Sequence, residues 1–356
     1  MREDFNKDVI LAYVAHLMCE YKEPVMLDFK PVKSLVAIND LLAGEEAEVI
    51  AEITAPLTLT EEEAITIPAG KKLTVKLDTD MTVGQVGFNV QDGGQLTLCG
   101  NGTIKSTNKT TTGAVIQASG KTAAVTLDGV TIDCISENGK DGNEAYAIYL
   151  SKDASLTFKS GTIKTAYGSC VATNNLTEGN TAINILGGEL LCDGSYAIYL
   201  PAQGELNIKG GKVQGINARM GHINISGNAE IIPTTITADT YDNIGKYFNN
   251  SSCIWLGDTI AVMAGTYTDK EGTDLVLNVT EDAKVKSDFR AAIGVYSVDT
   301  KEAQNVTINI ENKDNVTTTD AAFEAVKVYG HDYITTEAQT AGKTYTPVAE
   351  SVITIA

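Results

Sequence analysis

Residues that assemble many active sites are scarce in this sequence. It contains three histidines, and arginine occurs only at Arg2, Arg219 and Arg290. The six cysteines form no CxxC pair and have no histidine close by, which argues against a zinc site. No histidine has a serine, cysteine or aspartate at a spacing that suggests a nucleophilic triad. We therefore expect no catalytic residue, no bound metal and no cofactor.

Positive charge and long hydrophobic runs are also lacking. The chain has 27 basic and 46 acidic residues, a net charge of −19, whereas binding through phosphates depends on clustered Lys and Arg. The apolar stretch Val9–Cys19 is too short to span a bilayer, and acidic residues precede it in place of the basic start of an export signal. We expect no nucleic-acid partner, no membrane contact, and synthesis in a cytoplasm without a signal peptide.

Residues 1–50 show the apolar spacing of helices. One helix is expected over Phe5–Glu20 and a second over Ser34–Ala43, ending at Gly44, while Pro24 and Pro31 interrupt the pattern between them. The apolar residues of the two helices are Phe5, Val9, Tyr13, Leu17, Leu35, Ile38, Leu41 and Leu42. Two amphipathic helices have no core of their own. They are expected either to cap the structure that follows or to dock onto another chain.

From Leu57 onward the apolar period changes to two. Triplets such as Leu73-Thr74-Val75 place an apolar residue on each side of Thr or Asn, which is typical of short strands with one buried face. The triplet recurs about every 20 to 30 residues, a glycine-started strand follows most copies, and a third strand completes each repeat. Three short strands per repeat predict an all-β fold, a right-handed parallel β-helix whose coils bury their inward residues against one another.

The predicted organisation has three parts. Residues 1–50 form a helical N-terminal segment that serves as an anchor, 51–235 form the β-helix shaft, and 236–356 form a β-rich C-terminal region. In that last region the strand signal is weaker. Continued coils behind an insertion and a separate β-rich cap both remain open.

The glycine-started strands also predict a register. Aligning them places Ile104, Ile132, Ile163, Leu190 and Val213 in one inward column. Two residues further on, Cys134 and Cys192 then share a column with Thr165 between them. Two coils separate their backbones by about 9.6 Å. A disulfide tolerates Cα atoms up to about 7 Å apart, so we expect both thiols to stay reduced.

Two surface features are candidate sites. The carboxylate pairs Asp78/Asp80, Asp128/Asp133 and Asp141/Glu144 have a composition that glycoside hydrolysis could use, but such pairs arise by chance in so acidic a chain. Tyrosines recur in two repeats and could form an aromatic track for stacking of sugars, or stabilise the stack itself. These residues are Tyr146, Tyr149, Tyr196 and Tyr199.

A signal-less, acidic β-helix behind a short helical segment resembles the fibre, spike and head-decoration proteins of tailed bacteriophages. The resemblance covers Leu57 to about Ile231 and is one of architecture. It implies a structural virion protein, most similar to a head fibre, that docks on the capsid or another virion protein through residues 1–50. It also implies a homotrimer and contact with a polysaccharide. A tailspike-like polysaccharide-degrading enzyme and a glycan-binding adhesin are the alternatives.

Overall fold

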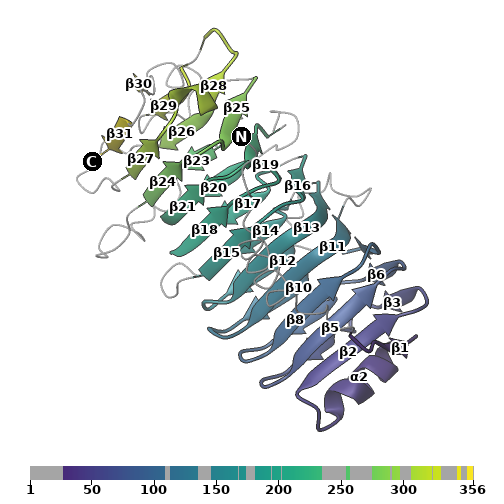
Figure 1. The fold of residues 1–356 in the computed structure, drawn as a ribbon. Helices are drawn as coiled ribbons and strands as arrows, with labels where there is room; N and C mark the ends of the chain where they lie inside the picture. Colours follow the sequence, from purple (N-terminus) through teal and green to yellow (C-terminus); the bar gives the residue numbers. More distant parts are fainter. Residues whose placement is uncertain are drawn as a thin grey trace, which may run out of the picture.

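The protein forms an elongated stack of short strands, as Figure 1 shows. The computed structural model describes residues 27–108, 113–134, 146–166, 168–173, 181–193, 195–201, 203–234, 254–256, 275–288, 291–296, 306–322, 324–329, 343–345 and 351–355. Most of them lie in strands, and nearly all strand pairs are parallel. The predicted all-β, parallel β-helix is therefore confirmed. Among the described residues, no helix has the length and apolar character that crossing a membrane requires.

The strands are arranged in three columns that run along the stack. The first column contains β2 (Glu48–Ile53), β5 (Lys72–Leu77), β8 (Gln95–Cys99), the first half of β11 (Ala124–Cys134), the first half of β13 (Ser155–Thr165), β15 (Thr181–Ile185), β18 (Gly204–Ile208), β21 (Gly221–Ile225), β24 (Leu275–Val279) and β27 (Val306–Ile310). The second contains β3 (Leu57–Leu59), β6 (Met81–Val83), β9 (Thr103–Ser106), the second halves of β11 and β13, β16 (Glu189–Cys192), β19 (Lys212–Gln214), β22 (Glu230–Ile232), β25 (Lys284–Ser287) and β28 (Val316–Thr318). The third contains β4 (Ile65–Ile67), β7 (Phe88–Val90), β10 (Ala114–Ser119), β12 (Tyr146–Ser151), β14 (Val171–Thr173), β17 (Ile198–Leu200), β20 (Ile216–Ala218), β23 (Ile254–Leu256), β26 (Ile293–Tyr296) and β29 (Val326–Tyr329).

Each coil contributes one strand to each column. The third column is a sheet of its own, whereas β11 and β13 run through both other columns and join them into one sheet. Strand order along the chain thus repeats as first, second and third column, as the sequence pattern predicts. The core lies inside the coils, where the inward residues of all three columns form one continuous cluster. Phe88 and Phe158 are its bulkiest aromatic residues with no solvent exposure.

The predicted inward register is confirmed. Ile132 pairs with Ile104 and with Ile163, and Leu190 pairs with Ile163 and with Val213. Thr165 pairs with Cys134 on one side and with Cys192 on the other, and neither cysteine forms a disulfide bond. The corner formed by these residues also contains the buried Cys170, whose thiol lies 3.2 Å from the Leu191 carbonyl oxygen.

These thiols should react slowly in the folded protein. Burial raises the pKa of the Cys134 thiol to about 12, and burial also raises the pKa of Cys170. Because the thiolate is the reactive species, little modification by iodoacetamide is expected at about pH 8 until the protein is unfolded. Mass spectrometry of alkylated native and urea-unfolded samples measures this. A Cys134–Cys192 disulfide in folded protein would contradict the register.

Side chains on the outer surface repeat from coil to coil as well. In the first column the central outward residue is Thr in four successive coils (Thr74, Thr97, Thr126, Thr157) and Asn in the following five (Asn184, Asn207, Asn224, Asn278, Asn309). Each of the last four asparagines donates its side-chain N–H to the amide oxygen of the previous one, over 3.2, 2.9, 2.7 and 2.6 Å. Such a ladder fixes the coil register, because a slip by one residue would break every bond in it.

The first coil is closed by the segment that precedes it. Helix α2 (Leu35–Ala43) begins after Ser34, whose hydroxyl accepts a hydrogen bond from the Ala37 N–H, and ends at Gly44. This matches the predicted helix, although Gly44 is extended rather than left-handed. The strand β1 (Lys30–Val32) pairs with β2 and was not predicted. Pro31 argues against a strand in the sequence pattern, because proline has no N–H to donate. It is tolerated in β1 because β1 is an edge strand.

The other end of the stack has a different closure. Strands β24 to β29 continue all three columns in parallel register. Beyond residue 236 the chain therefore forms further coils of the same stack and not a separate cap. A 3-10 turn, η2 (Lys313–Asn315), precedes β28. Strands β30 (Lys343–Tyr345) and β31 (Ser351–Ile355) then pair antiparallel with β29 and β27. They cover two of the three open edges, where exposed strands would otherwise invite association.

Candidate functional site

Two of the predicted tyrosines share one outward row of the third column. Tyr149 pairs with Ala172, and Ala172 pairs with Tyr199, so the two tyrosines are two coils apart. Both side chains are partly exposed, while Ala172 between them is buried. The inward neighbours Ile148 and Ile198 belong to the core. Strand alternation therefore aims both tyrosines away from the core, as a sugar-stacking surface requires.

The remaining two tyrosines differ from each other. Tyr146 is partly exposed, and its ring stacks on that of Tyr149 with centroids 5.9 Å apart and an interplanar angle of 14°. Tyr196 is only 2% exposed, so its ring is part of the interior. The exposed part of the predicted aromatic track is therefore Tyr146, Tyr149 and Tyr199.

Two further residues lie beside Tyr199 and were not singled out from the sequence. The Arg219 guanidinium lies over the Tyr199 ring, 5.0 Å from its centroid, in the geometry of a cation–π contact. Asn217 pairs with Tyr199 across the ladder and is 3% exposed. A sequence signal exists for Asn217, which occupies the outward position of β20 (Ile216–Ala218), and Arg219 directly follows that strand. Recognising these residues as neighbours of Tyr199 requires an alignment of the third-column strands between coils, and β20 is only three residues long.

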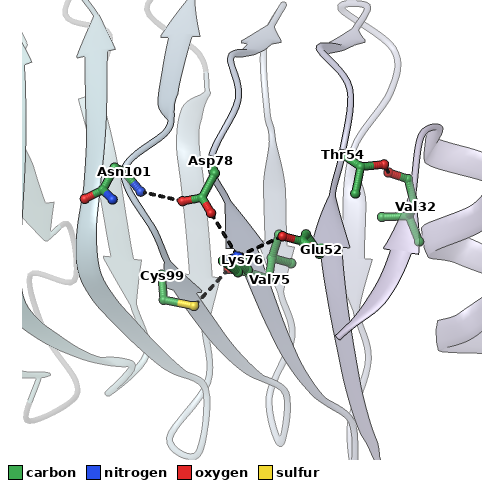
Figure 2. A network of polar contacts seen from close by, with 8 residues as sticks. All are labelled: Val32, Glu52, Thr54, Val75, Lys76, Asp78, Cys99 and Asn101. Atoms are coloured by element: carbon green, nitrogen blue, oxygen red, sulfur yellow. Dashed lines mark hydrogen bonds and ion pairs between the residues drawn. The ribbon is translucent and has the colours of Figure 1, made fainter. Parts of the chain in front are cut away.

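Three of the candidate carboxylates, Asp78, Asp80 and Asp128, form ion pairs with lysines. Asp78 pairs with Lys76 at 3.0 Å and accepts a hydrogen bond from the Asn101 N–H at 3.1 Å, as Figure 2 shows. Lys76 also bonds Glu52 of the previous coil at 2.8 Å. Its hydrogen bonds to Glu52 and then Asp78 raise the pKa of Lys76. The Lys76 hydrogen bond, followed by that of Asn101, lowers the pKa of Asp78. A general acid of a glycosidase needs the opposite shift.

The other candidate carboxylates in the described residues do not form an acid–base pair either. Asp80 pairs with Lys105 at 2.9 Å. Asp128 pairs with Lys159 at 3.5 Å and accepts a hydrogen bond from the Ser160 hydroxyl at 2.9 Å. Asp141 and Glu144 lie outside the described residues, as do His16 and His331. Over the described part of the chain, no group of three or more His, Cys, Asp or Glu side chains could hold a metal ion.

The predicted anchoring residues fall into two sets. Those of the first helix, Phe5, Val9, Tyr13 and Leu17, lie outside the described residues. In α2, Ile38 is fully buried and Leu42 is 5% exposed, and Leu35 and Leu41 pack partly against the same core. The apolar side of α2 thus covers the first coil. Its opposite side presents Val36, which is 67% exposed.

Comparison with known proteins gives no relationship from which a function could be transferred. No protein-family model, no curated protein and no solved structure matches the chain.

Proposed function

We propose that this chain is a structural protein of a virion, a bacteriophage head fibre or decoration protein that projects a β-helical shaft. The form of the described molecule supports this. It is an elongated stack with one continuous core, closed by α2 and β1 at one end and by β30 and β31 at the other (Figure 1). A rod with two different closed ends suits a role in which one end docks and the other points outward.

Docking is proposed to occur through residues 1–50 on the capsid or another virion protein. The inward side of α2 is used for capping, which leaves its outward side for a partner. Val36 on that side is 67% exposed, and Leu27 just before β1 is 45% exposed. Exposed apolar side chains at one end of a charged rod are suited to a protein contact. The capping and docking interpretations of this segment are thus compatible, since each uses a different side of α2.

We also propose that three copies associate side by side. A narrow shaft buries little surface alone, and a closed homotrimer would cover more of it. A solution mass equal to that of one chain, 37.7 kDa, would argue against the trimer.

A polysaccharide-degrading tailspike is the alternative with the same layout. The lowered pKa of Asp78 and the lysine partners of Asp80 and Asp128 disfavour it. The structural role therefore remains our proposal, without an assigned reaction.

Removal of residues 1–26, combined with Leu27→Asp and Val36→Asp, tests the docking directly. The truncated chain keeps β1, α2 and all coils, so it should remain folded with an unchanged circular dichroism spectrum. It should fail to co-sediment with particles that lack the native protein, whereas the full chain should bind them. Equal co-sedimentation of the two proteins would overturn docking through this segment.

A further inference from the structure

Carboxylates bridge each step between the coils of β2, β5, β8, β11 and β13, which we call the N-terminal coils. Glu52 of β2 bonds Lys76 of β5 at 2.8 Å, and Asp78, after β5, accepts the Asn101 N–H of the next coil at 3.1 Å. Cohesion between these coils therefore draws on ionised groups at every step. The remaining bridges are Glu48–Lys72 at 3.0 Å, Asp80–Lys105 at 2.9 Å, Asp92–Thr122 at 2.8 Å, Asp128–Lys159 at 3.5 Å and Asp128–Ser160 at 2.9 Å.

Amide groups bridge the coils of β15, β18, β21, β24 and β27, which we call the C-terminal coils. Each step between them contains one bond of the ladder from Asn184 to Asn309, with donor–acceptor distances between 3.2 and 2.6 Å. An amide is neutral and does not titrate where carboxylates do, so acid leaves this ladder in place. Carboxylates add further bonds here: Glu205 accepts from the Asn224 side chain at 3.4 Å, Glu281 from the Gly227 N–H at 2.6 Å and Glu311 from the Glu281 N–H at 2.8 Å.

The bridging carboxylates of the N-terminal coils stabilise the stack only while they are ionised. Hydrogen bonds from Thr122, first from its N–H and then from its hydroxyl, lower the pKa of Asp92, and the pKa of Asp78 is lowered as well. A carboxyl group whose pKa is lower in the folded than in the unfolded chain adds stability above the unfolded value, about 4. This stability is lost as the pH falls from about 4 to about 2.

The least exposed of these ion pairs joins two coils and also holds a third group. The side chains of Lys76 and Glu52 are 37% and 31% exposed, and Lys76 bonds Asp78 at 3.0 Å as well (Figure 2). When the carboxylates take up protons, Lys76 keeps its charge and loses both partners. Because coils of a solenoid contact only their neighbours, this weakening stays with the coils that the carboxylates bridge. The other charged or titratable groups around the bridging carboxylates are Lys72, Lys105, Lys152, Lys159, Cys99 and Asp133.

We propose that the shaft consists of two halves that respond differently to acid. Below about pH 4 the N-terminal coils loosen, together with α2 and β1 that close them, while the C-terminal coils keep their register through the asparagine ladder. The stack thus contains a pH-sensitive device that opens it from one end only. This device does not depend on what the shaft is attached to, so it stands or falls separately from the proposed virion role.

Hydrogen–deuterium exchange of the full chain, read by mass spectrometry at about pH 7 and about pH 3, tests this directly. Protection factors, which correct for the effect of pH on the intrinsic exchange rate, should fall by about tenfold or more in β5, β8 and β11. Those of β18, β21 and β24 should change by less than about threefold. At about pH 7, sodium chloride at about 1 M should cause a smaller fall in the same N-terminal strands, because it shortens the Debye length to about 3 Å.

The triple variant Asp78→Asn, Asp92→Asn and Asp128→Asn isolates the cause. Asparagine has nearly the shape of aspartate but does not titrate, so this variant should have lower protection at about pH 7 and lose little more at about pH 3. Glu281→Gln combined with Glu311→Gln is the matched control and should keep the native pH response of the N-terminal coils. Asn224→Ala, which breaks the ladder, should lower protection in β21 and β24 equally at both pH values.

The proposal is overturned if acid lowers protection equally in both halves, in neither half, or in the C-terminal coils alone. It is also overturned if the triple variant keeps the full pH response of the native chain, because the bridging carboxylates would then not be its cause. The native chain alone decides the first of these outcomes, so the test does not depend on the folding of any variant.

Discussion

Replacing Gly161 by alanine should lower the free energy of unfolding by about 4 kcal/mol. Gly161 lies where β13 bends from the first column into the second, with φ at +108°, a conformation that L side chains rarely adopt. A Cβ atom there would lie 2.2 Å from the carbonyl oxygen of Val130 in the neighbouring coil. Neither backbone can move aside, because the adjacent coils hold both. The strain and the clash therefore add.

Gly70→Ala is the matched control. Gly70 also has a positive φ, +77°, but no atom lies within 4 Å of its Cβ position. Only the backbone strain remains, so the expected loss is about 1 kcal/mol. Urea denaturation followed by circular dichroism measures both variants. Equal losses in the two would mean that the coils do not approach at the Gly161 bend as the structure describes.

A charge placed under the N-terminal cap should have the second large effect. Ile38→Asp puts a carboxylate at a fully buried position between α2 and the first coil, at a cost of about 4 kcal/mol or more. Because coils of a solenoid contact only their neighbours, we expect α2 and β1 to detach while the later coils stay folded. Limited proteolysis should then cut within residues 33–47, and the uncovered edge should promote aggregation.

Val36→Asp separates this capping role from docking. Val36 lies two residues away in the same helix but is 67% exposed, so its replacement should change stability by less than about 0.5 kcal/mol. If the outward side of α2 meets the particle, the same variant should weaken co-sedimentation with it. Protease sensitivity of Val36→Asp equal to that of Ile38→Asp would contradict the assigned orientation of the helix.

The column structure was predictable because its signal is local. A triplet such as Leu156-Thr157-Phe158 indicates which residues point inward, and the glycine that follows it, Gly161, marks the bend to the next strand. The column of Ile132, Ile163 and Leu190 follows from aligning those glycines, and the structure has the same register. Strict alternation and a fixed glycine leave few other ways to bury the apolar residues.

Relations between coils were harder to predict, because the loops differ in length. Asn217 and Tyr199 are neighbours only once the third-column strands are aligned, and β20 is a strand of three residues. The role of α2 could not be predicted from the sequence for another reason. Its apolar side would look the same whether it covers a coil or a partner protein, and only the burial of Ile38 and Leu42 in the structure identifies what it covers.

Electron cryo-microscopy of purified native virions tests the central proposal most directly. The account predicts slender shafts on the particle surface whose cross-section fits three β-helical coils and whose particle-proximal end is the α2 end of the chain. Each shaft should be built of three copies. Particles on which this protein is absent, or on which the β30–β31 end faces the capsid, would contradict it.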